Sequence, residues 1–296
     1  MRTLTGTLTA KQKLLEGLAP VIALEVSDRP VEVPRWDWTQ VTSEAEASCH
    51  GAACVTNTGA VVRVRVTTAG ALQSCRITDL PAGNWTAWST VAAGPYSVLG
   101  GVSVGAATDS ATLVMGYVDS TERNMLYRTS GDGGVTWSGE VSLSWEAVGA
   151  SIKGVGLVGG AGYVYLAWTV DSGAAEPNDT LKVMRNQVGV GWGVVWTKAA
   201  LDMLTACGCA LDGTTQLVAL GGAKGLSRID FDWATSTWVQ ASPLVLVPAG
   251  SGAGYTLDVA RAFLSPDGSG RFYYTWLETW TVNVIGSRYW FACTAT

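Results

Sequence analysis

Residues 130–137 read Ser-Gly-Asp-Gly-Gly-Val-Thr-Trp. Glycine reaches backbone conformations that other residues resist, and an Asp side chain can accept the N–H groups of a tight turn. A Trp at the end of such a turn supplies a large ring for packing. The stretch therefore predicts a turn between two strands, in which Asp132 bonds the backbone and Trp137 packs inward against the sheet.

An Arg that precedes such a turn and its Trp recurs along the chain. Arg128 precedes Trp137, and comparable positions follow at intervals of 43 to 60 residues. The repeated residues are Arg76, Arg128, Arg185, Arg228 and Arg288. A period near 50 residues with several strands in each unit is typical of β-propeller blades. We interpret the repeated Arg as stacking on the Trp of its own blade, and a ring of Arg around one anion site is the alternative.

Each repeat begins with a strand of small residues, which is followed by a strongly apolar strand. Strands nearest a propeller axis crowd together, so they require small side chains, while the second strands bury larger ones between neighbouring blades. The predicted first strands are 52–56, 101–106, 154–158, 206–211 and 259–264. The predicted second strands are 61–66, 112–118, 163–170, 216–220 and 271–277.

The predicted fold is all-β: a five-bladed β-propeller of four-stranded blades over residues 33–296. The blades are placed at about 48–92, 96–143, 145–199, 203–244 and 255–296. The last repeat lacks a Trp-bearing fourth strand, and residues 35–41 resemble residues 84–91. We therefore expect residues 33–42 to supply that outer strand and close the ring. A six-bladed or incomplete propeller is the alternative.

Residues 1–32 lie outside the repeats and are interpreted as an N-terminal arm. A short helix is expected near residues 10–18, followed by a hairpin around residues 28–30. The arm either docks on another subunit or folds back on the propeller.

The turn at 130–137 matches the pattern S-x-D-x-G-x-T-W at Ser130, Asp132, Gly134, Thr136 and Trp137. This pattern resembles the Asp box, or BNR repeat, of sialidase-like propellers. The resemblance implies a structural role for the turn, away from the catalytic face of that family. The other repeats keep the Trp but not the box, so the resemblance is strong at one turn and weak elsewhere.

Composition excludes several classes of partner. The net charge is −5, and no basic run of the kind that binds nucleic acid or a membrane surface occurs. No transmembrane helix and no signal peptide are predicted, so a virion or extracellular location would be reached by another route, such as lysis or particle assembly.

The six Cys and the single His, His50, do not have the spacing of a zinc site. The Cys residues are interpreted as small buried residues of strands, and a disulfide such as Cys54 with Cys75 is the alternative. No metal and no cofactor are predicted.

Sialidases use an Arg triad, a Tyr nucleophile with a Glu partner, and an acidic acid/base, and they begin with an Arg-Ile-Pro-like segment. The nearest segment here, residues 62–66, has no Pro; its Arg63 and Arg65 are expected to face one side of a strand together. The sequence therefore predicts no catalytic residues and no enzyme activity.

The leading hypothesis is a non-enzymatic structural or interaction protein of a phage tail or another extracellular assembly. The opening residues, 4–13, followed by Arg35-Trp36-Asp37-Trp38, resemble the start of some bacteriophage tail-associated proteins. The expected partners are other subunits, in a homo-oligomer or with virion proteins, and surface glycans are a further class. A glycan-binding, lectin-like propeller is the alternative, and a sialidase-type glycosidase is the second alternative.

Candidate ligand-binding residues lie in the segments expected to join second to third strands. Polar groups beside an aromatic ring are the combination that binds a sugar. The candidates are Arg123, Asn124, Asp179, Glu278 and Trp280.

Overall fold

The computed structural model describes residues 50–78, 85–98, 100–174, 177–201, 204–222, 225–248, 255–264, 272–280 and 286–293. For 50, 204–206 and 222, and from 246 onward, it describes the backbone alone. The predicted arm (1–32) and closing strand (33–42) lie outside the described residues. The described residues form strands, turns and loops and no helix, so they contain no helix that could cross a membrane.

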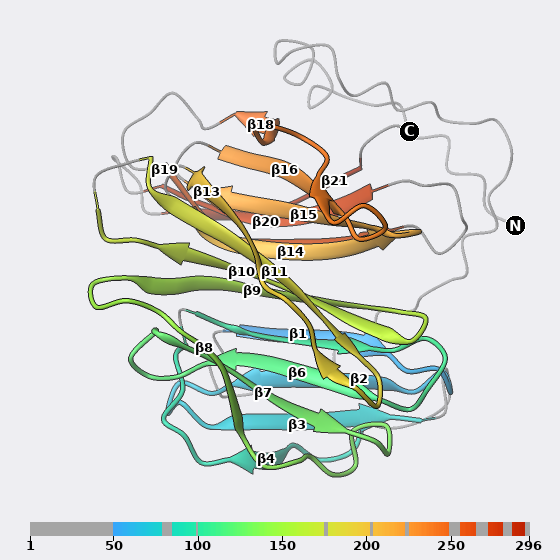
Figure 1. The fold of residues 1–296 in the computed structure, drawn as a ribbon. Helices are drawn as coiled ribbons and strands as arrows, with labels where there is room; N and C mark the ends of the chain where they lie inside the picture. The colour runs from blue at the N-terminus through green and yellow to red at the C-terminus, as the bar shows by residue number, and fades with distance from the viewer. Residues whose placement is uncertain are drawn as a thin grey trace, which may run out of the picture. The chain divides into compact units, whose positions relative to one another are not determined.

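The first two sheets each contain four antiparallel strands in chain order (Figure 1). The first consists of β1 (His50–Val55), β2 (Val61–Val66), β3 (Leu72–Ile77) and β4 (Ser89–Ala92). The second consists of β5 (Val102–Ala106), β6 (Leu113–Val118), β7 (Asn124–Ser130) and β8 (Val141–Trp145). The predicted all-β chain with four-stranded antiparallel sheets is confirmed for these residues.

In the third and fourth sheets, the outer strand is interrupted and consists of two short strands. Both short strands pair with the third strand of their sheet. The third consists of β9 (Ser151–Gly160), β10 (Tyr163–Asp171), β11 (Asp179–Gln187), β12 (Gly191–Trp192) and β13 (Trp196–Leu201). The fourth consists of β14 (Leu204–Asp212), β15 (Thr215–Gly222), β16 (Gly225–Asp232), β17 (Thr237–Trp238) and β18 (Leu244–Pro248). Regular pairing is interrupted between the two strands, at residues 193–195 in the third sheet and 239–243 in the fourth.

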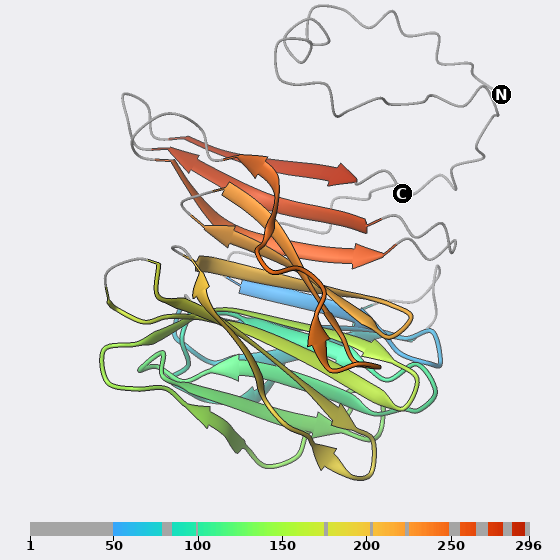
Figure 2. The same cartoon turned by 45° about the horizontal axis from the view of Figure 1, so that its top comes forward.

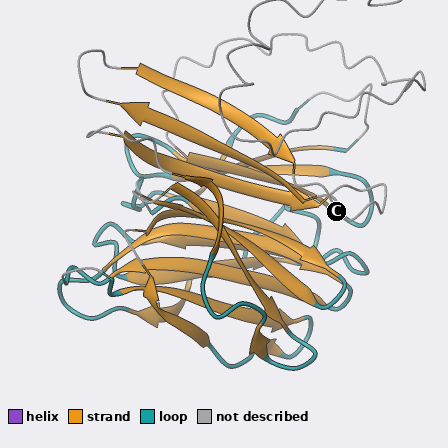
Figure 3. Cartoon of the chain, turned by 90° about the horizontal axis from the view of Figure 1, so that it is seen from above, coloured by secondary structure: helices purple, strands orange, loops and turns teal. Residues whose placement is uncertain are grey.

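The fifth sheet contains three described strands, β19 (Tyr255–Leu264), β20 (Phe272–Trp280) and β21 (Gly286–Cys293). The first strands of successive sheets contact one another, in the order β1, β5, β9, β14 and β19 (Figure 2). Figure 3 shows the same sheets from above, with strands in orange.

Small residues are required where these first strands meet. A Cβ added to Gly159 of β9 would lie 1.5 Å from the carbonyl oxygen of Ala106 in β5. A Cβ on Gly156 would lie 3.1 Å from the backbone nitrogen of Cys209 in β14. The predicted reason for small side chains in the first strands is therefore confirmed at both contacts.

The apolar core lies between neighbouring sheets. Alternate residues of β10 face opposite ways, because side chains alternate along a strand. Leu166 and Trp168 pack with residues of the second sheet, while Tyr165 and Ala167 pack with residues of the fourth. Each sheet thus needs its neighbours to bury both faces.

The turn at 130–137 is built around one carboxylate. Asp132 accepts hydrogen bonds from the backbone N–H groups of Val135 and Thr136, both at 3.0 Å, and from the Thr136 hydroxyl at 2.6 Å. Gly134 has a φ of +85°, which favours glycine. Trp137 packs against the core between the first two sheets and donates from Nε1 to the Ser74 hydroxyl of β3 at 3.2 Å.

These hydrogen bonds lower the pKa of Asp132 from 3.8 to about 2, with the Thr136 hydroxyl as the largest cause. Because the folded pKa is depressed, the stabilisation is fully present above the ordinary carboxyl pKa and is lost as pH falls through about 2. We expect an NMR carboxyl titration of Asp132 to give that value, and Thr136→Val to raise it. A wild-type pKa near 3.8 would contradict the hydrogen bonding of the turn.

Two interpretations from the sequence do not match the structure. Arg128 and Arg185 do not stack on the Trp of their own blade: the Arg128 guanidinium binds Tyr117, and that of Arg185 lies over Trp233 of the fourth sheet. Cys54 and Cys75 are not joined by a disulfide. Burial raises the pKa of the Cys54 thiol to about 12, as expected of a thiol that serves as a small apolar group.

The prediction that Arg63 and Arg65 face the same side of a strand is confirmed. Both guanidinium groups lie over the Trp88 ring, at 5.1 and 4.1 Å from its centroid.

Candidate functional site

Arg123 and Asn124, both predicted ligand residues, stand together at the start of β7. Their backbone N–H groups donate to the Asp119 carboxylate, each at 3.0 Å. The guanidinium of Arg123 lies 5.4 Å from the centroid of the Trp145 ring and donates to the Glu146 carbonyl oxygen at 2.9 Å. The Asn124 side chain accepts from Ser142 and is buried. These contacts shape the end of the second sheet.

The other predicted ligand residues lie in different sheets. Asp179 belongs to the third sheet, is 1% exposed and accepts from the Ser172 N–H at 3.2 Å, which fixes the loop before β11. Glu278 and Trp280 form the end of β20, where they pair with Arg288 and Gly286, rather than lying in a loop. Their side chains lie outside the described part of the structure.

A buried ion pair joins the second and third sheets. Glu146 is 6% exposed, and its carboxylate accepts from the Lys182 ammonium at 2.7 and 2.8 Å. The Nε1 group of Trp168 and the hydroxyl of Ser144 donate to the same carboxylate at 3.3 and 3.0 Å. The pair therefore connects the segment after β8 with β11.

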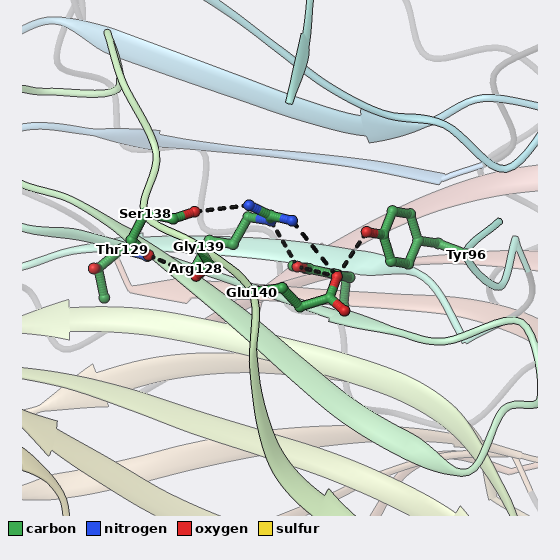
Figure 4. A network of polar contacts seen from close by, with 7 residues as sticks. Tyr96, Arg128, Thr129, Ser138, Gly139 and Glu140 are labelled. Carbon is green, nitrogen blue, oxygen red and sulfur yellow. Dashed lines mark hydrogen bonds and ion pairs between the residues drawn. The ribbon is translucent and has the colours of Figure 1, made fainter. Parts of the chain in front are cut away.

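A second carboxylate network is more open to solvent (Figure 4). The Glu140 site consists of Tyr96, Tyr117, Arg128 and Glu140. The Tyr96 and Tyr117 hydroxyls donate to Oε2 of Glu140 at 2.6 and 3.0 Å. Nη2 of Arg128 lies 3.6 Å from the same oxygen, while its Nε donates to the Tyr117 hydroxyl at 2.9 Å. The Tyr rings meet edge to face with centroids 4.8 Å apart.

Four chain segments position the Glu140 site. Tyr96 lies in the connection from β4 to β5, where its N–H donates to the Gly70 carbonyl at 3.0 Å. Tyr117 is a buried residue of β6 and Arg128 belongs to β7. Glu140 immediately precedes β8. Nη1 of Arg128 also donates to the Ser138 carbonyl at 2.7 Å, which ties it to the segment that carries Glu140.

Burial determines which groups are donors in this site. The pKa values of Tyr96 and Tyr117 are both raised, with burial as the largest cause. Both hydroxyls are therefore protonated donors at neutral pH, and Glu140 is the acceptor. The Glu140 side chain is 36% exposed, and no residue in the described ranges donates to its other oxygen, Oε1.

The Glu140 side chain is thus partly exposed, while two hydroxyl donors and the Arg128 ion pair fix its Oε2. A carboxylate held in this way is pre-organised to accept a hydrogen bond from a ligand, because its orientation is already set. The described residues contain no group of three or more His, Cys, Asp or Glu that could hold a metal.

Sequence reasoning singled out Arg128 as a repeated residue but missed Tyr96, Tyr117 and Glu140. Tyr96 and Glu140 are 44 residues apart and share no motif. The only signal was the position of Glu140, three residues after Trp137, and this pattern does not recur at the other turns.

No protein-family model matches the chain, and no curated protein sequence matches it. Solved structures resemble it in fold. The α-L-arabinanase of Penicillium chrysogenum is 13% identical; the match covers 78% of this chain and 77% of the arabinanase, with a TM-score of 0.52. An α-L-arabinofuranosidase of Fusarium graminearum is 11% identical; the match covers 81% of this chain and 80% of the arabinofuranosidase, with a TM-score of 0.54. The lectin of Aleuria aurantia is 10% identical; the match covers 81% of this chain and 78% of the lectin, with a TM-score of 0.49.

These neighbours are β-propeller proteins, and likeness at such identity shows the fold alone. The described sheets therefore have a propeller-like arrangement. The comparisons contradict the prediction that the chain is not an enzyme, because the arabinanase and the arabinofuranosidase, whose TM-scores exceed 0.5, are glycosidases. That prediction rested on missing motifs, and catalytic groups drawn from separate strands of a fold leave no motif. The findings give no support to a role in a phage tail.

Proposed function

We propose that the chain is a carbohydrate-binding β-propeller, with each of its five sheets as one blade, and that the Glu140 site holds the sugar. The observation that carries the proposal is the Glu140 carboxylate, whose Oε2 is fixed by two Tyr hydroxyls and the Arg128 ion pair while the side chain is 36% exposed. Sugars present hydroxyl groups that donate to carboxylates and accept from guanidinium groups.

Arg128 and Tyr96 complete a suitable set of contacts. A guanidinium has five N–H donors, and the hydrogen bonds to Tyr117 and Ser138 engage two of them, while Nη2 forms the ion pair with Glu140. The Tyr96 ring is half-buried, so part of it remains for stacking on a sugar face. Acceptor, donor and aromatic ring thus lie within one network.

Glu140→Gln tests the proposal. The substitution keeps the shape of the side chain but removes the charge, so a charge-assisted hydrogen bond to the sugar is lost. We expect binding to the best ligand of a glycan array, which includes arabinan and sialylated glycans, to weaken about 10- to 100-fold. Glu122→Gln is the matched control, because Glu122 lies between β6 and β7 of the second sheet, pairs with Lys153 of β9 and lies outside the site.

The control variant is expected to bind as the wild type does. Equal binding by Glu140→Gln and wild type would place the sugar elsewhere, and a wild-type chain that binds no glycan would refute the function itself. Circular dichroism spectra of the variants must overlay, so that a folding defect is not scored as lost binding.

A glycosidase is the second candidate, and the Tyr96–Glu140 contact of 2.6 Å favours it. A Tyr nucleophile beside a Glu base is one arrangement by which glycosidases act. The raised pKa of Tyr96 opposes ionisation of its hydroxyl at neutral pH, which favours binding as the first candidate. Incubation of the same glycan panel with the protein separates the two: product that Tyr96→Phe fails to form would establish catalysis at this site.

A further inference from the structure

The outermost strand of the fourth sheet differs from the outermost strands of the other sheets. β18 reads Leu-Val-Leu-Val-Pro, whereas β4, β8, β13 and β21 each contain Ser, Thr, Lys or Arg. Polar and charged residues on an edge strand normally prevent pairing with another chain. β18 has no such protection among its side chains.

β18 has an open edge within the described structure. It pairs with β16 on one side, and no described strand pairs with its other side. Leu244 and Val245 are 51% and 65% exposed, although both are apolar. An edge of this kind leaves backbone N–H and C=O groups in position to bond another extended strand.

Neighbouring apolar residues extend this edge into what we call the outer patch. It consists of Val194, Val195, Trp196, Val239, Leu244 and Val245, all at least 36% exposed. The third and fourth sheets pack together beneath the patch, because the rings of Trp196 and Trp238 both contact the buried Phe231. The Lys198 ammonium also donates to the Gln240 carbonyl at 3.4 Å.

The six residues of the outer patch carry no charge, and Lys198 at its border has its ammonium on the Gln240 carbonyl. Residues 186–197 and 233–248 contain no Asp, Glu, Lys or Arg. A charged partner surface would lose its hydration there without gaining an ion pair, so the partner surface must be uncharged and apolar. It must also offer an extended edge strand, because the backbone groups of β18 need one.

The outer patch itself meets both requirements. We propose that it is the interface between two copies of this chain, related by a two-fold axis, with β18 antiparallel to β18 of the second copy. A two-fold axis lets one patch serve both copies and closes the contact, so the assembly stops at a dimer. Leu244 of one copy would then face Val245 of the other.

Two features keep the proposed pairing short. A β-bulge leaves Leu246 without a partner in β16, and Pro243 and Pro248 flank the apolar residues. Bulges and prolines limit how far an edge can pair, so backbone pairing is confined to a few residues and side chains of the outer patch supply most of the contact.

Sedimentation of the full chain over a range of concentrations tests the interface. We expect a dimer for the wild type and a dissociation constant raised about 100-fold by Val245→Lys, which sets two ammonium groups close to the two-fold axis. Val148→Lys is the matched control, because Val148 is 88% exposed between β8 and β9, and it is expected to remain a dimer.

Amide hydrogen exchange provides the second measurement. Amides of residues 244–247 should exchange more slowly at high protein concentration than at low concentration, while those around Val148 should not change. A wild-type monomer at every soluble concentration overturns the proposal. So does a dimer that survives Val245→Lys, or one without concentration-dependent protection of β18.

Discussion

Replacement of Trp168 by Ala is expected to lower the free energy of unfolding by about 3–5 kcal/mol. The Trp168 ring is fully buried in the core between the second and third sheets. Its removal leaves a cavity that rigid strands on both sides cannot fill. It also removes the Nε1 donor to the Glu146 carboxylate, which is buried beside Lys182. Urea unfolding of the variant and the wild type measures the difference.

Trp145→Ala is the matched control for this measurement. Trp145 belongs to β8, is 61% exposed and has the Arg123 guanidinium over its ring. Its loss removes a cation–π contact at a solvent-exposed position, so we expect a change of about 1 kcal/mol or less. Similar losses for the two variants would mean that the second and third sheets do not enclose Trp168 as the structure has it.

The strands could be predicted from the sequence because each repeat carries its own local signals. The predicted second strands 61–66 and 163–170 correspond to β2 and β10, which agree to within one residue. Alternating apolar residues and glycine-rich turns specify a strand without reference to distant parts of the chain. The divided outer strands of the third and fourth sheets were missed, although Pro243 is a local signal for the break in the fourth sheet.

The Glu140 site could not be predicted in the same way. Local patterns do not show which side chains from different segments meet, and this site needs Tyr96 beside Glu140, 44 residues later. The Glu146–Lys182 pair, 36 residues apart, was missed for the same reason. The predicted ligand residues were chosen by composition, which does not separate a polar side chain that fixes a loop, such as Asp179, from one that faces solvent.

Pre-organisation links the fold of the Glu140 site to its proposed function. Tyr117 is fully buried in the core between the first and second sheets, so its hydroxyl is a fixed point from which Arg128 and Glu140 are oriented. A ligand that meets groups already held in place loses less conformational freedom on binding. The rigidity of the sheets is therefore what makes a small polar site at the surface useful.

Gly159→Ala is expected to destabilise the chain by about 3 kcal/mol, the upper end of the usual cost of overpacking. The added methyl group would occupy the position of a backbone carbonyl, that of Ala106, which cannot rotate away as a side chain would. β9 would have to move from β5, and the contact between the second and third sheets would loosen with it. Gly139→Ala is the control, because a Cβ there meets nothing within 4 Å. A thermal melt that shows equal stability for both variants would mean that the first strands do not approach as closely as the structure shows, and the reason for small residues in those strands would then have to be sought in the turns.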